Sequence, residues 1–72
     1  MMIDIDEYER LLFELENKLM QRIEDGEQPS DIYLEGIVGG VHDFTSDSGS
    51  SVIFLMLMND GIEWLRTKEE GD

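Results

Sequence analysis

The sequence predicts an α+β fold in which one N-terminal amphipathic helix packs on a small antiparallel β-meander of three or four strands. Apolar residues recur at the helical period over the first third of the chain. A continuous apolar run follows later, and the turn sequence Asn59-Asp60-Gly61 separates it from another apolar segment. We expect a single domain over residues 1–68 and a disordered acidic tail over 69–72.

The segment 4–25 has the features of an amphipathic helix. Asp4 is placed to cap its start, with Glu7 three residues later, and Gly26 and Pro29 follow its end. A single apolar stripe at spacings of three and four residues is formed by Ile5, Tyr8, Leu11, Leu12, Leu15, Leu19 and Ile23.

The second half of the chain favours strands because β-branched and aromatic residues are frequent there. The segment 31–45 contains three glycines that would each cost about 1 kcal/mol inside a helix. We therefore expect one bent strand there, with a hairpin or a helix as alternatives. The segments 51–58 and 62–68 are expected to pair as a hairpin through the link that contains Asp-Gly. Residues 46–51 are expected to form a polar turn or loop.

The predicted central strand is apolar on both of its faces, which a single covering helix cannot bury. The face that carries Ile53, Leu55 and Leu57 is therefore expected to join a second copy in a homodimer. Phe13 and Met20 fall off the helical stripe. They either border a broad buried face or form a second contact strip that helps self-association.

Charge limits the classes of partner. Eighteen acidic residues stand against five basic ones, which gives a formal net charge of −13. Phosphate backbones are bound through lysine and arginine, so we expect no direct binding of nucleic acid or of an anionic membrane. The longest uncharged apolar run, 52–58, is too short to span a bilayer. The absence of cysteine and of a basic leader favours a cytoplasmic protein.

No pattern of residues indicates catalysis, a cofactor or a metal site. His42 is the only histidine, and it is interpreted as a surface residue paired with Asp43. The segment from Asp43 to Gly49 has the oxygen-rich character of a calcium loop, but its glycine arrives one position late and Phe54 occupies the position of the last ligand. We therefore expect a non-enzymatic protein.

The expected function is binding of a larger protein that has a basic surface. The acidic residues expected to present a polyanionic, nucleic-acid-like surface to it are Glu14, Glu16, Glu24, Asp25, Glu27, Asp31 and Glu35. In size, charge and lack of catalytic residues the chain is similar to the small acidic proteins that phages and mobile elements use against host nucleases and defence systems. This similarity implies an inhibitor or regulator. The alternative is a structural homo-oligomer whose charge serves solubility only.

Overall fold

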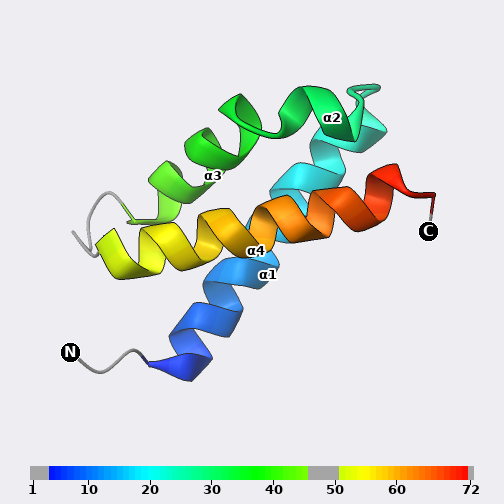
Figure 1. Cartoon of the computed structure of the whole chain (residues 1–72). Coiled ribbons are helices and arrows are strands. Elements are labelled where there is room, and N and C mark those ends of the chain that lie inside the picture. Colours follow the sequence, from blue (N-terminus) through cyan, green and yellow to red (C-terminus); the bar gives the residue numbers. More distant parts are fainter. Residues whose placement is uncertain (1–3, 46–50, 72) are drawn as a thin grey trace.

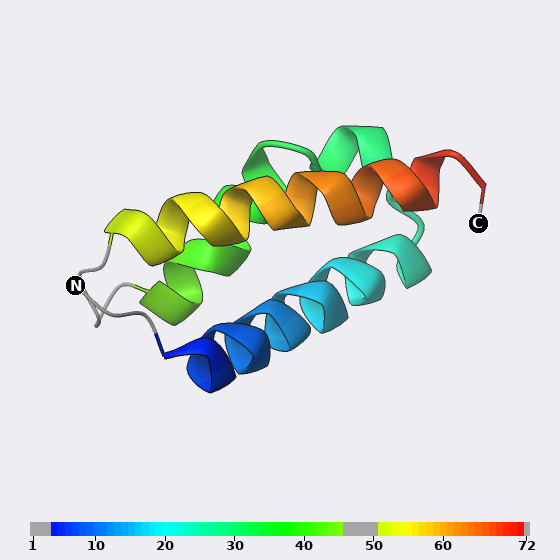
Figure 2. The same ribbon diagram turned by 60° about the horizontal axis from the view of Figure 1, so that its bottom comes forward.

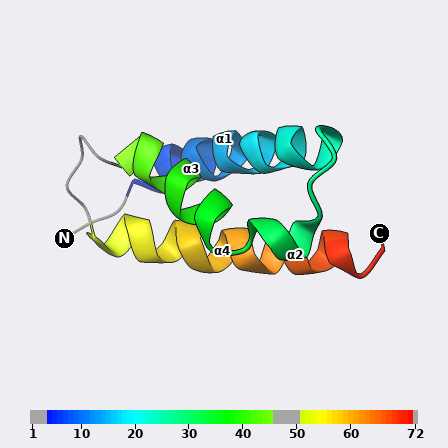
Figure 3. The same ribbon diagram turned by 90° about the horizontal axis from the view of Figure 1, so that it is seen from above.

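The computed structural model describes residues 4–45 and 51–71, and most of these residues are helical. They are α1 (Ile5–Glu24), α2 (Pro29–Ile32), α3 (Glu35–Thr45) and α4 (Ser51–Glu69) (Figure 1). The described residues contain no strand, so the predicted α+β class is wrong and the fold is a small all-helical bundle. Figure 3 shows α1 and α4 running in the same direction. The chain returns from the end of α1 to the start of α4 through α2 and α3.

The predicted N-terminal helix is confirmed as α1. The Asp4 carboxylate caps it by accepting the backbone N–H groups of Asp6 at 3.0 Å and Glu7 at 3.4 Å. At the other end Gly26 has a φ of 106°, a left-handed conformation that glycine adopts without strain. The N–H groups of Gly26 and Glu27 bond back to Ile23 and Arg22, the pattern of a Schellman motif. Pro29 then begins α2, where its missing N–H costs nothing.

The predicted strand over 31–45 is wrong, because α2 and α3 occupy most of this segment. Two glycines in the second half of the chain allow close helix packing that offsets their poor helix propensity. A Cβ on Gly40 of α3 would lie 2.8 Å from Cδ1 of Leu15, and a Cβ on Gly61 of α4 would lie 3.2 Å from Cδ2 of the same side chain. Leu15 is fully buried between these two helices. The packing of three helices around one leucine therefore determines the backbone here, against the local propensity.

The predicted hairpin of 51–58 and 62–68 is also wrong, because α4 passes through Asn59-Asp60-Gly61 without interruption. Leu57, Gly61 and Leu65 are buried and lie four residues apart, on one face of α4. A continuous apolar run fits a strand or a buried helix equally well by pattern alone, and here the helix is formed. The predicted polar turn over 46–51 lies outside the described residues except for Ser51, where α4 begins.

The core lies where α1, α3 and α4 meet, and α2 closes one end of it (Figure 2). Its buried apolar side chains are Leu11, Leu15, Leu19, Ile32, Ile37, Val41, Leu57 and Leu65. Within the described ranges, no helix combines the length and the apolarity that crossing a membrane requires.

Candidate protein-binding surface

The C-terminal ends of α1 and α4 lie at the same end of the molecule (Figures 1 and 3), and acidic residues are present at both of them. We call this end of the molecule the acidic end and define it by Glu24, Asp25, Asp31, Glu69 and Glu70. Glu24 is the last residue of α1 and Asp25 its C-cap, while Glu69 and Glu70 stand at the end of α4. Each helix C-terminus also carries the equivalent of roughly half a negative charge from its aligned peptide dipoles. The negative potentials of side chains and backbone therefore add at this end.

Most carboxylates of the acidic end lack a basic partner. Among the residues that the structure describes, no Lys, Arg or His nitrogen lies within 4.0 Å of a carboxylate of Glu24, Asp25, Asp31 or Glu70. Asp25 accepts a hydrogen bond of 3.3 Å from the Gln21 amide, which leaves its charge in place. This surface therefore keeps free charge that could meet a basic partner.

Glu27, in the turn after α1, does have a basic partner, because Arg22 donates two hydrogen bonds to its carboxylate. Arg22 Nε donates to Oε2 at 2.8 Å and Nη2 donates to Oε1 at 2.6 Å. These bonds hold the pKa of the Glu27 carboxyl below its ordinary value and raise the pKa of the Arg22 guanidinium. Glu27 thus stabilises the turn after α1 and offers less free charge than its neighbours.

The structure separates the other residues predicted for the acidic surface. Glu14 and Glu16 lie in the middle of α1, away from the acidic end. Residues two positions apart in an α-helix are rotated by about 200° relative to each other. They therefore point to opposite sides, and Arg10 pairs with Glu14 at 3.1 Å. Glu35 is exposed at the start of α3. The sequence analysis missed Glu69 and Glu70, which come to this surface only because α4 continues to residue 69.

All five bases of the chain have partners of their own. Arg10, Lys18, Arg22 and Arg66 form ion pairs with carboxylates, and Lys68 lies 5.2 Å from the centre of the Trp64 ring. A hollow between α1 and α3 includes Lys18 and Arg22, but both are neutralised in this way. Four of the five bases therefore lie beside a carboxylate of the described residues, and Lys68 keeps its charge beside the Trp64 ring.

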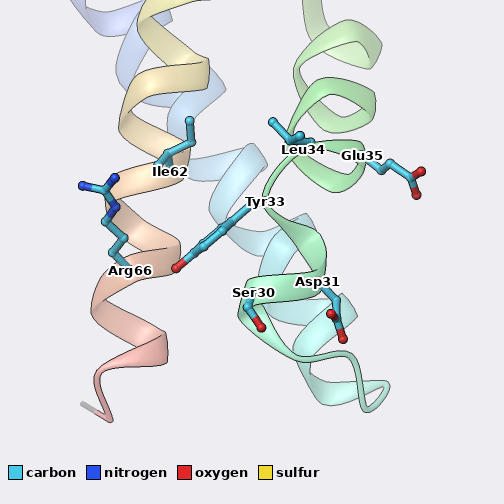
Figure 4. Close-up of a pocket in the computed structure, with 7 residues that line it drawn as sticks. All are labelled: Ser30, Asp31, Tyr33, Leu34, Glu35, Ile62 and Arg66. Carbon is cyan, nitrogen blue, oxygen red and sulfur yellow. The ribbon is translucent and has the colours of Figure 1, made fainter.

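A groove of about 650 Å³ lies between α4 and the junction of α2 with α3. We call it the α3–α4 groove. Tyr33 and Leu34 reach into it from the junction and Ile62 from α4, as Figure 4 shows. Its polar edge is formed by Ser30, Asp31, Glu35 and Arg66. The Tyr33 hydroxyl donates to Glu69 at 3.0 Å, and partial burial together with this bond raises the pKa of Tyr33.

The residues predicted for self-association do not share one face. Leu57 is fully buried in the core, Ile53 is half-buried, and Leu55 is 66% exposed. The predicted face depended on the two-residue period of a strand, which α4 does not have. On α1, Phe13 is 64% exposed, whereas Met20 is half-buried.

The titratable groups in the described residues form no recognisable catalytic arrangement. His42 is exposed on α3, and the neighbouring Asp43 pairs with Lys18 at 2.6 Å. This ion pair lowers the pKa of Asp43. No group of three or more His, Cys, Asp or Glu side chains in the described ranges converges on a point that could hold a metal ion. Most of the calcium-like segment, residues 46–50, lies outside those ranges.

Comparison with protein-family models, with curated proteins and with solved structures finds no match to this chain.

Proposed function

We propose that this chain is a non-enzymatic binding module that presents its acidic end to a basic site on a larger protein. The observation that carries the proposal is the meeting of unpaired carboxylates at the shared end of α1 and α4. A polyanionic surface of this kind competes with a nucleic-acid backbone for lysine and arginine side chains. In this proposal the chain regulates or inhibits a protein that binds nucleic acid, a role suited to a phage or mobile element acting against host defence.

In the test, the chain competes with labelled duplex DNA for a purified basic DNA-binding protein. The fluorescence anisotropy of the DNA measures how much of it remains bound. The native chain should displace DNA from a susceptible protein, and displacement should weaken as salt rises because exposed charges are screened within about 8–10 Å. Reversal of Glu24, Asp25 and Asp31 to lysine should remove the effect.

The matched control reverses Asp6, Glu9 and Glu16 to lysine. It changes the net charge by the same amount on residues of α1 that form no ion pair among the described side chains. Equal loss in both triple variants would show that only net charge matters, and displacement that does not respond to salt would contradict the proposal.

Self-association is a second candidate function, favoured by apolar side chains that the fold leaves exposed. Leu55 is 66% exposed, Leu34 70% and Phe13 64%. Burial of such side chains against a second copy would stabilise a homodimer. Sedimentation equilibrium of the native chain and of Leu55→Glu at high salt decides this, because the native chain should then be heavier than the variant.

A further inference from the structure

The α3–α4 groove joins two exposed apolar rows that belong to different helices. Leu34 is 70% exposed at the start of one row, and Val38 follows one turn later at 40%. On α4, Leu55 lies two turns before Ile62, on the same face of the helix. The two rows meet at the groove, because Leu34 and Ile62 line it together (Figure 4).

The length of these rows matches a short amphipathic helix. Seven residues along α4, from Leu55 to Ile62, correspond to about 10 Å of helix. A partner helix that places apolar residues at positions i, i+3 or i+4, and i+7 covers the same distance. The groove lies between α4 and the junction of α2 with α3, and a groove between helices is a usual setting of helix-in-groove recognition.

Charge identifies what kind of helix fits. Asp31 and Glu35 line the side of the groove that α2 and the start of α3 form, with their side chains directed away from α4 (Figure 4), and neither forms an ion pair among the described residues. Arg66 is the only base that lines the groove, and Glu63 neutralises it at 3.2 Å. A second copy of the chain carries a net charge of −13 and would be repelled as a whole, whereas a basic segment would be attracted to this edge.

We propose that the α3–α4 groove binds a basic amphipathic helix of the partner protein. The apolar face of that helix lies on Leu34, Tyr33, Ile62 and Leu55, and its flanking lysines or arginines reach Asp31 and Glu35. This inference rests on the proposed function and deepens it: the acidic end attracts the basic partner, and the groove adds the apolar contacts that hold one segment of it.

The experiment titrates the full isotope-labelled chain with synthetic peptides and follows amide chemical shifts. The first peptide is a helical leucine–lysine sequence with leucines at i, i+3, i+4 and i+7, and the second is a scrambled sequence of the same composition. The amphipathic peptide should shift the amides of Tyr33, Leu34 and Ile62, and the scrambled peptide should not. It should also bind about tenfold more tightly, which corresponds to burial of at least one leucine.

Leu34→Ser should lower the affinity of the chain for the amphipathic peptide by about tenfold. Phe13→Ser is the matched control, because Phe13 is similarly exposed but lies on α1, outside the groove. Both positions are surface positions, so both variants should keep the native helical circular dichroism spectrum. Equal affinity of Leu34→Ser and Phe13→Ser for the amphipathic peptide would overturn the proposal.

Three outcomes would contradict the groove proposal, and they differ in what they imply for the acidic end. In the first outcome, both peptides bind with equal, salt-sensitive affinity and shift only amides around Glu24 and Asp25. This result would overturn the groove and leave the proposed function intact. No binding of either peptide would count against both. A Leu34-dependent homodimer in sedimentation experiments, with no peptide bound, would assign the groove to a second copy and overturn the proposal made here.

Discussion

At the scale of single residues, neighbouring glycines of α3 have opposite surroundings. A Cβ on Gly39 would meet no atom within 4 Å, whereas a Cβ on Gly40 would lie 2.8 Å from Cδ1 of the buried Leu15. Gly39→Ala should therefore stabilise the protein by about 0.5–1 kcal/mol, because alanine loses less backbone entropy in a helix. Gly40→Ala should destabilise it, since the added methyl would force the buried Leu15 side chain to shift in the core. Urea denaturation measures both, and a loss of stability in Gly39→Ala would contradict the helical α3.

Tyr8 connects α1 to α4 through its hydroxyl, which donates a hydrogen bond to the Asp60 carboxylate. Burial first, and then this bond and the Asp60 charge, raise the pKa of Tyr8 above its ordinary value. A raised pKa in the folded state means that this contribution to stability is complete below about pH 10, the ordinary tyrosine pKa, and is lost as the pH rises further.

An alkaline titration of tyrosinate absorbance tests this assignment. The tyrosines of the native chain should ionise at a higher pH than free tyrosine. Tyr8→Phe should remove the transition at the higher pH and leave that of Tyr33. The variant should also lose less stability than the native chain above pH 10. A Tyr8 that titrates at the ordinary tyrosine pKa would exclude the contact with Asp60.

At the scale of elements, α4 gives two nearby leucines opposite environments. Leu57 is fully buried and Leu55 is 66% exposed. Leu57→Ala should lower the free energy of unfolding by about 2–5 kcal/mol through lost burial and a cavity. Leu55→Ala should change it by no more than about 0.5 kcal/mol. On one face of a strand the two positions would share an environment, so similar losses in chemical denaturation would argue against the helix.

At the scale of the whole molecule, the net charge of −13 opposes the compact state. Sodium chloride should therefore raise the melting temperature, because repulsion between exposed carboxylates is screened. The variant with Glu24, Asp25 and Asp31 changed to lysine should respond less to salt, since its repulsion is weaker at the end where α1 and α4 terminate. Thermal unfolding at several salt concentrations measures both, and a melting temperature that falls with salt would contradict this account of the charge.

The sequence alone determined α1 and its ends. The apolar period from Leu11 to Leu19, the Asp4 cap and the left-handed Gly26 are local features, and local hydrogen bonds of the backbone suffice to set them. The excess of acid and the absence of cysteine are likewise properties of composition. The position of Glu24 and Asp25 at the end of α1 follows from the same local features.

Only the tertiary structure decided the second half of the chain. The apolar run at 52–58 fits a strand or a helix, and the glycines of α3 and α4 locally disfavour a helix. Leu15 changes that balance, because Gly40 and Gly61 allow α3 and α4 to pack closely against its side chain. The same packing brings Glu69 beside Tyr33 and forms the α3–α4 groove. Those contacts join residues far apart in sequence, so no local pattern carries them.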